Sequence, residues 1–155
     1  MSKVGFIGVG TMGCPMASNI ISKGNDLKFY DPFVHDENKS KLKNLGAQYC
    51  TSIKDLLDDR EIVITMLPNG NNVKDVCLGE DGLLKQDKKD FIHIDMSTIL
   101  PADSIKINKE FESHNIKMFD APVARLVNNA IDGTLLILVG GDKDKFEQIK
   151  PLLET

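Results

Sequence analysis

Short apolar runs alternate with helix-like patterns along almost the whole chain, and this alternation restricts the fold more than any other feature. Residues 62–67, Ile-Val-Ile-Thr-Met-Leu, are apolar at nearly every position and rich in β-branched side chains. A run of that kind is typical of a strand buried on both faces, as in a parallel sheet. The alternation therefore predicts an open, doubly wound α/β fold, with a mostly parallel sheet and helices on both of its faces.

Turn and helix signals locate the individual elements. Met12, Met16 and Ile20 lie four residues apart and form one face of a helix, and Ser52, three residues before Asp55, predicts a capping box. We expect strands at residues 3–9, 27–30, 47–50, 61–67, 91–95, 117–121 and 134–139. We expect helices at 12–23, 37–45, 52–57, 73–78, 101–115 and 128–131, and a last one from 143. One domain, residues 1–155, accounts for all of these elements.

Composition and charge argue against several other classes of protein. The chain has 155 residues and is 41% hydrophobic, which is enough for a folded core, and no run approaches the ~20 apolar residues of a membrane span. A net charge of −4 without a basic stripe argues against a nucleic-acid partner. Cys14, Cys50 and Cys77 are widely spaced, which predicts small buried side chains, no metal site and a reducing, cytoplasmic location. Residues 58–61 predict a solvated turn, and His93, inside a strand, predicts a core histidine.

Residues 8–13, Gly-Val-Gly-Thr-Met-Gly, carry the sharpest local motif, between the first strand and the first helix. Gly8 permits the tight turn, Gly10 lets the backbone approach a pyrophosphate, and Gly13 lets the helix pack closely on the strand. The phosphates would meet free N–H groups at the positive end of the helix dipole. The motif therefore predicts a Rossmann domain with a dinucleotide cofactor. A tight turn without a ligand is the alternative.

Asp31 bears on which dinucleotide binds. It ends the second predicted strand, 21 residues beyond Gly10, where a carboxylate accepts hydrogen bonds from the adenosine ribose. A 2′-phosphate there would meet a like charge, and residues 32–35 supply no Lys or Arg to neutralise it. We therefore expect NAD as the cofactor in preference to NADP. The alternative is that Asp31 is a plain turn residue before Pro32.

Ligands of an open parallel sheet bind beyond the carboxyl ends of its strands, which singles out a few more side chains. Leu67 and Pro68 would form an apolar wall for the cofactor, and Thr98 a polar contact near the nicotinamide. These residues and Ser97 are also ordinary strand-end and helix-start residues. Arg125 is the only cation between Lys117 and Lys143, and its guanidinium suits a carboxylate, phosphate or sulfonate.

Arg125 has alternatives of its own. It could be a solvated loop residue, or it could pair with Asp120 or Asp132. We expect Ser97 and Ala124 to join Arg125 as contacts of a small anionic substrate.

These stretches together resemble the β-hydroxyacid dehydrogenase family, which includes 3-hydroxyisobutyrate dehydrogenases and tartronate semialdehyde reductases. The matching segments are residues 6–17, 66–70, 95–99, 120–123, 133–135 and 140–141. The family signature continues D-A-P-V-S-G-G, whereas this chain has Ala124-Arg125-Leu126. An arginine in place of the first glycine resembles the 3-sulfolactaldehyde reductase branch, in which it recognises the substrate sulfonate.

The resemblance implies roles for particular residues and for parts of a longer enzyme. It implies that Arg125 is the anion anchor, and it assigns as NAD contacts Thr11, Met12, Asp31, Leu67 and Thr98. The family's catalytic lysine and an all-helical second domain would lie past Thr155, so no catalytic residue is expected here. The resemblance implies that the chain alone is a largely inactive monomer and that the complete enzyme is a homo-oligomer.

The leading hypothesis is the NAD-binding domain of an oxidoreductase that moves a hydride between NAD(H) and a small anionic 3-hydroxyacid or semialdehyde. A non-catalytic dinucleotide-sensing module is the alternative from another class. A methyltransferase with an adenosyl cofactor would share the glycine loop and the ribose-binding acid, but nothing else in the chain matches one.

Overall fold

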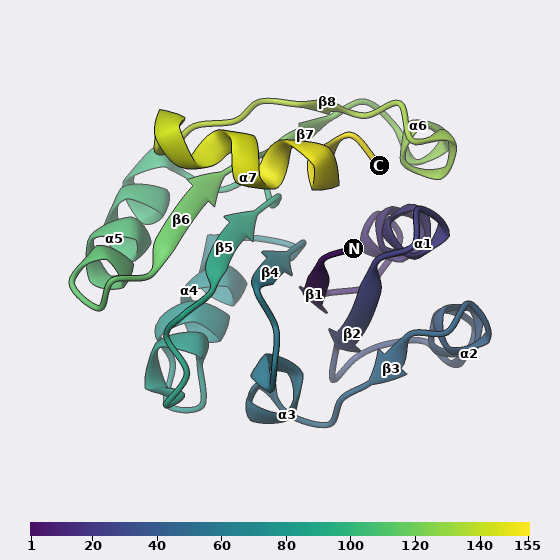
Figure 1. Cartoon of the computed structure of the whole chain (residues 1–155), viewed down its shortest axis with the longest axis horizontal. Helices are drawn as coiled ribbons and strands as arrows, with labels where there is room; N and C mark the ends of the chain where they lie inside the picture. The colour runs from purple at the N-terminus through teal and green to yellow at the C-terminus, as the bar shows by residue number, and fades with distance from the viewer.

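A computed structural model of the chain describes all residues from Met1 to Thr155 and shows one Rossmann-type sheet of six parallel strands (Figure 1). The strand order is β3-β2-β1-β4-β5-β6. Strands β2 and β3 are added on one side of β1 and strands β4 to β6 on the other, so the order reverses between β1 and β4. The six strands are β1 (Lys3–Ile7), β2 (Asp26–Tyr30), β3 (Gln48–Tyr49), β4 (Ile62–Thr65), β5 (Ile92–Asp95) and β6 (Lys117–Asp120). The predicted fold class is confirmed.

Helices cover both faces of this sheet. They are α1 (Gly13–Ser22), α2 (Asp36–Asn44), α3 (Ile53–Leu57), α4 (Gly70–Leu78), α5 (Pro101–Glu112), α6 (Val127–Asp132) and α7 (Lys143–Leu153), with a 3-10 turn η1 at Leu83–Lys85. One core lies under α1, α2, α6 and α7 and contains Phe6, Phe29 and Ile64. The other lies under α3, α4, α5 and η1 and contains Ile7 and Val63. None of the helices is both long and apolar enough to span a bilayer.

Capping side chains explain where two helices begin. Ser52 caps α3, as predicted, because its hydroxyl accepts a hydrogen bond from the Asp55 amide at 3.1 Å. The next helix, α4, begins at Gly70 and not at the predicted residue 73. The Asn69 side chain accepts hydrogen bonds from the amides of Asn71 and Asn72, and this cap adds a turn to the helix.

The predicted strand at 134–139 does not join the parallel sheet. Only Leu136–Ile137 forms a strand, β8, and it pairs antiparallel with β7 (Val123–Ala124), a strand that was not predicted. This ribbon is a separate two-stranded sheet, linked to the end of β6 by an antiparallel bridge between Asp120 and Gly140, and Leu136 and Leu138 are exposed. The strand predicted at 134–139 is therefore present but shorter than expected, because an apolar run of five to six residues does not by itself reveal how much of it pairs or with which strand.

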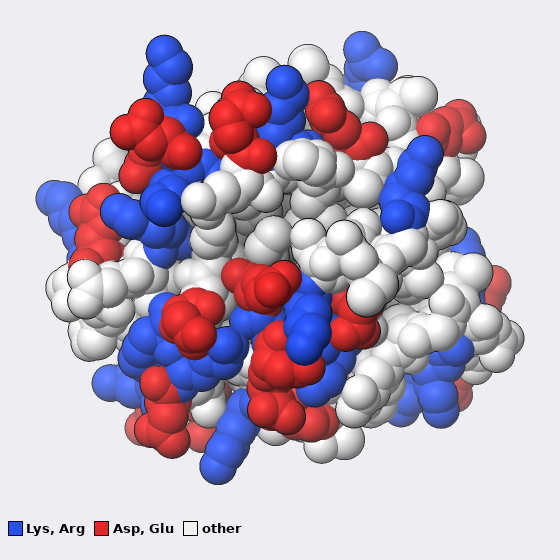
Figure 2. Space-filling model, in the orientation of Figure 1, with Lys and Arg blue, Asp and Glu red and all other residues white.

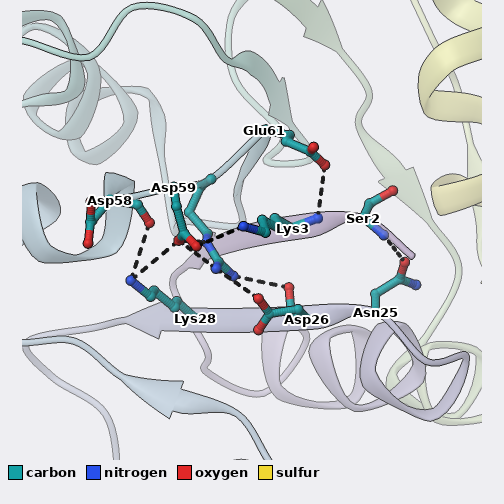
Figure 3. A network of polar contacts seen from close by, with 9 residues as sticks. Ser2, Lys3, Asn25, Asp26, Lys28, Asp58, Asp59 and Glu61 are labelled. Carbon is teal, nitrogen blue, oxygen red and sulfur yellow. Dashed lines mark hydrogen bonds and ion pairs between the residues drawn. The ribbon is translucent and has the colours of Figure 1, made fainter.

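The predicted solvated turn at 58–61 is exposed at Asp58, Asp59 and Glu61, but the prediction was wrong for Arg60. Arg60 is only 2% exposed and its guanidinium donates to the Asp26 carbonyl and to the carboxylates of Asp26 and Asp59. Lys3 and Lys28 add further ion pairs to Asp59, at 3.0 and 3.6 Å (Figure 3). These hydrogen bonds, first from Arg60 and then from Lys3, hold the pKa of the Asp59 carboxyl well below its usual range. The cluster joins β1, β2 and β4 at their amino ends, opposite the edge where ligands bind such sheets.

Candidate dinucleotide site

The glycine loop between β1 and α1 is held by two close backbone approaches. Gly8 has a φ of +91°, and a Cβ there would collide with the Met66 carbonyl oxygen. A Cβ on Gly13 would collide with the Gly8 carbonyl oxygen. A Cβ on Gly10, in contrast, would meet nothing within 4 Å. Gly8 and Gly13 are therefore required by the fold itself, whereas the backbone of Gly10 is open to solvent.

The same loop presents a row of free amides. The Gly8 amide donates to the Tyr30 carbonyl and the Val9 amide to the Asp31 carboxylate. The next four amides, residues 10–13, donate to no acceptor within the chain. They stand at the amino end of α1, where the helix dipole is positive. This arrangement is suited to binding an anion such as a pyrophosphate.

Asp31 lies beside these amides at the end of β2. Its Oδ2 accepts the Val9 amide at 3.0 Å and its Oδ1 accepts the Phe33 amide at 2.8 Å. A carboxylate has about four acceptor positions, so two hydrogen bonds leave capacity for a ligand hydroxyl. The Asn38 side chain also donates to the Val9 carbonyl, at 2.9 Å. The acid and the loop are thus fixed relative to each other before any ligand arrives.

A cleft of about 890 Å³ opens where the chain reverses direction, at the carboxyl ends of β1, β2 and β4. Its lining contains four acidic residues and no Lys or Arg. Across the face drawn in Figure 2, basic and acidic side chains are interspersed, with no continuous basic stripe. The structure brings together in this cleft eight of the predicted site residues: Gly8, Gly10, Thr11, Met12, Gly13, Asp31, Leu67 and Pro68.

The remaining predicted residues lie outside that lining. Thr98 is exposed and follows β5, which is two strands away from β1 in the sheet. Ser97, predicted as a substrate contact, is fully buried, and its hydroxyl accepts the Leu67 amide at 2.9 Å. It therefore supports the Leu67 turn from behind and presents no surface to a ligand in this structure.

A buried polar cluster lies behind the turns that carry Leu67 and Ser97. Asp95 is fully buried and accepts hydrogen bonds from the Thr65 hydroxyl at 2.8 Å and the Ser97 amide at 3.1 Å. Because the Thr65 hydroxyl donates to Asp95, it accepts from Nε2 of His93 at 3.0 Å. Burial raises the pKa of the Asp95 carboxyl and lowers that of His93 to about 3, so the histidine is neutral. It is a core residue, as predicted, although its Nδ1 has no hydrogen-bond partner.

Arg125 follows β7 and is exposed, and it does not line the dinucleotide cleft. Its φ is +89°, a left-handed conformation that disfavours any side chain with a Cβ. Its Nη1 donates to the Thr134 carbonyl at 2.9 Å, and it forms no ion pair with Asp120 or Asp132. Ala124 is half-buried in β7 beside it.

Sequence reasoning missed the far wall of the cleft. That wall is formed by α3, α4 and the segment after α4, through Ile53, Asn72, Asp75, Val76, Glu80, Asp81 and Gly82. These positions have no motif, and only the packing of α4 beside β1 and β4 brings them to the site. Phe33 and Asn38 were missed on the near side, although both lie close to Asp31 in the sequence.

A loop of free amides, an acid at the end of the second strand and a cleft at the reversal point define a dinucleotide-binding domain of the Rossmann class. A family profile described as the NAD binding domain of 6-phosphogluconate dehydrogenase matches residues 3–155. The chain belongs to this family, and its cofactor class is NAD.

Individual relatives carry related names. The 3-sulfolactaldehyde reductase of Escherichia coli K12 is 40% identical over 153 residues, which are 99% of this chain and 51% of that protein. Human mitochondrial 3-hydroxyisobutyrate dehydrogenase is 39% identical over 150 residues, 97% of this chain and 44% of that protein. The structure of Mycobacterium tuberculosis 3-hydroxyisobutyrate dehydrogenase with L-serine has a TM-score of 0.89 at 32% identity, covering 99% of this chain and 51% of that one. The chain thus spans about half the length of the curated relatives it matches.

Proposed function

We propose that this chain is the dinucleotide-binding half of an NAD-dependent reductase or dehydrogenase for a small anionic 3-hydroxyacid or semialdehyde. The observation that carries the cofactor part is the row of free amides at residues 10–13, next to the fixed carboxylate of Asp31. The amides would hold the pyrophosphate, and Asp31 would accept hydrogen bonds from the adenosine ribose. Leu67 and Pro68 would flank the nicotinamide half, with Thr98 beyond them.

The lining charges favour NAD over NADP in this proposal. A 2′-phosphate about 4 Å from Asp31 would be repelled by roughly 4 kcal/mol at an effective dielectric of 20, before screening by salt. Asp31, Asp75, Glu80 and Asp81 all line the cleft, and no cation there offsets them. Among the structural neighbours, a protein with NADP⁺ bound shares the fold at 26% identity with a TM-score of 0.89, so the fold alone does not decide between the two cofactors.

The conformation and contacts of Arg125 support the proposal of a small anionic substrate. A non-glycine residue at positive φ costs of order 1–3 kcal/mol, and such strain concentrates at functional sites. The guanidinium uses one donor on Thr134 and keeps the others for a planar anion. We propose that it anchors the charged end of a three-carbon substrate, and 40% identity to a 3-sulfolactaldehyde reductase makes a sulfonate the first anion to test.

The bound dinucleotide supplies or accepts the hydride. The chain's own residues bind and orient it: the amides hold the phosphates, Ser97 holds the Leu67 turn in place, and Arg125 orients the substrate. We assign no residue of this chain to proton transfer to the substrate oxygen. The 155 residues alone are therefore proposed to bind cofactor without efficient turnover.

Calorimetry with NADH and NADPH tests the cofactor assignment directly. We expect NADH to bind and NADPH to bind at least tenfold more weakly. Absence of heat for both ligands, on protein shown to be folded by circular dichroism, would refute the proposed function.

The substrate anchor needs a separate experiment. With NAD⁺ saturating, Arg125→Ala should weaken binding of 2,3-dihydroxypropane-1-sulfonate, the alcohol formed by reducing 3-sulfolactaldehyde, severalfold and leave NAD⁺ affinity unchanged. The alternative, a non-catalytic dinucleotide sensor, predicts no binding of this alcohol to the unsubstituted protein. Equal losses for both ligands in Arg125→Ala would contradict the anchor role.

A further inference from the structure

Phe33 is an aromatic side chain left almost entirely in solvent. It is 87% exposed, whereas Phe6, Phe29, Phe91 and Phe111 are no more than 4% exposed. An exposed phenyl ring forgoes the favourable burial that drives most aromatic side chains inward. Phe33 also lines the 890 Å³ cleft, two residues after the acid proposed to bind the ribose.

The backbone that carries this ring is fixed. The Phe33 amide donates to Asp31 Oδ1 at 2.8 Å, and the Val34 amide donates to the Asp31 carbonyl at 3.3 Å. Pro32 restricts the intervening φ angle. Because Oδ2 of Asp31 also accepts the Val9 amide, the turn that carries Phe33 is tied to the glycine loop through one carboxylate. The backbone from which the ring projects is therefore held by the same group that would bind the ribose.

The cleft offers an apolar surface from other elements as well. Ile53 of α3 and Val76 of α4 belong to its lining, as Phe33 does. An adenine attached to a ribose held by Asp31 lies within one glycosidic bond of that sugar. A planar base in this position would lie within reach of the exposed Phe33 ring, and an aromatic ring stacks favourably on another flat π-system.

We propose that Phe33 is the residue that binds the adenine of the dinucleotide, by stacking its ring on the base. The inference rests on the proposed function, because it requires a dinucleotide with its ribose at Asp31. In this proposal the Phe33 side chain contributes to the affinity for the dinucleotide and not to the stability of the fold. Substituting it should therefore change ligand binding while leaving the unfolding temperature unchanged.

A first experiment compares Phe33→Ala with the unsubstituted chain by titration of NADH and of ADP-ribose, which lacks the nicotinamide. Stacking of a base on an aromatic side chain contributes about 1–3 kcal/mol, and at an open cleft we expect the low end, about a five- to tenfold loss for both ligands. Ile105→Ala is the matched control, because Ile105 is 56% exposed and lies outside the cleft. It should bind both ligands as the unsubstituted chain does.

A second experiment reports contact directly. The chain contains no tryptophan, so Phe33→Trp introduces a single fluorophore at the proposed stacking position. Saturating ADP-ribose should quench its emission, with an affinity equal to or tighter than that of the unsubstituted chain. Ile105→Trp should show no change under the same conditions.

The outcomes separate this inference from the proposed function. If the unsubstituted chain binds NADH and ADP-ribose, but Phe33→Ala binds them equally well, the adenine assignment is overturned and the proposed function stands. Unchanged emission of Phe33→Trp at saturation by ADP-ribose overturns it in the same way. If the unsubstituted chain binds neither ligand, the proposed function fails and this inference fails with it.

Discussion

Replacing Arg125 by glycine should make the protein more stable than replacing it by alanine. Arg125 has a φ of +89°, a conformation that costs a residue with a Cβ about 1–3 kcal/mol. Alanine keeps that strain, whereas glycine removes it and loses about 0.4–1 kcal/mol through the greater freedom of the unfolded chain. Both variants lose the exposed hydrogen bond to the Thr134 carbonyl, so that loss cancels in the comparison. We therefore expect Arg125→Gly to exceed Arg125→Ala by about 1 kcal/mol in the free energy of unfolding.

Urea denaturation of the two variants and the unsubstituted protein measures this difference. For a chain of 155 residues, about 1 kcal/mol corresponds to roughly 2–4 °C in the unfolding temperature, which scanning calorimetry resolves. Arg125→Gly should also be at least as stable as the unsubstituted protein, while its binding of 2,3-dihydroxypropane-1-sulfonate falls with that of Arg125→Ala. If the two variants are equally stable, the backbone at this position is unstrained and the argument for a retained functional arginine loses its basis.

Three further perturbations test other parts of the structure. Gly10→Ala should leave the unfolding temperature within 1–2 °C and weaken NADH binding more than tenfold by calorimetry, because its Cβ meets only what binds there. Asp31→Asn should weaken NADH about tenfold and reduce the preference over NADPH, whereas Asp36→Asn, an exposed acid outside the cleft, should change neither. His93 is neutral when folded, with a pKa lowered to about 3 by burial, and the unfolded chain binds its proton below pH 6.5. Its contribution to stability is therefore lost as pH falls from about 6.5 toward 3, by up to about 1.4 kcal/mol per pH unit, and His93→Gln should show a shallower acid dependence in urea denaturation.

Most of the fold was predictable because its signals are local. The apolar run at β4 and the helical face of Met16 and Ile20 identify their elements from spacing alone, and the structure confirms both. The ribbon of β7 and β8 was not predictable, because two strands of two residues each have too little pattern to reveal an antiparallel partner. Arg60 was misjudged for a related reason: acidic neighbours in the sequence indicate solvent, but its burial depends on Asp26, 34 residues away.

The candidate site likewise contains residues that their spacing in the sequence identified and residues that only the structure revealed. The glycine loop and Asp31 were identified by their spacing, and the structure places them together in one cleft. Ser97 was predicted as a substrate contact, and only the register of β4 against β5 shows its hydroxyl behind the Leu67 turn. The exposed ring of Phe33 has no sequence signal at all, since six other phenylalanines in the chain look the same in the sequence.

The sequence by itself determined the strand–helix alternation, the free amides of the glycine loop and the acid that follows the second strand. These depend on covalent chirality, on helix ends and on spacings of a few residues to about twenty. Only the tertiary structure decided which residues face the cleft from α3 and α4, which polar groups are buried, and which residue is held at a strained φ. Those properties arise from contacts between segments that are separated in the sequence, such as Thr65 with Asp95 and β7 with β8, and local pattern does not encode them.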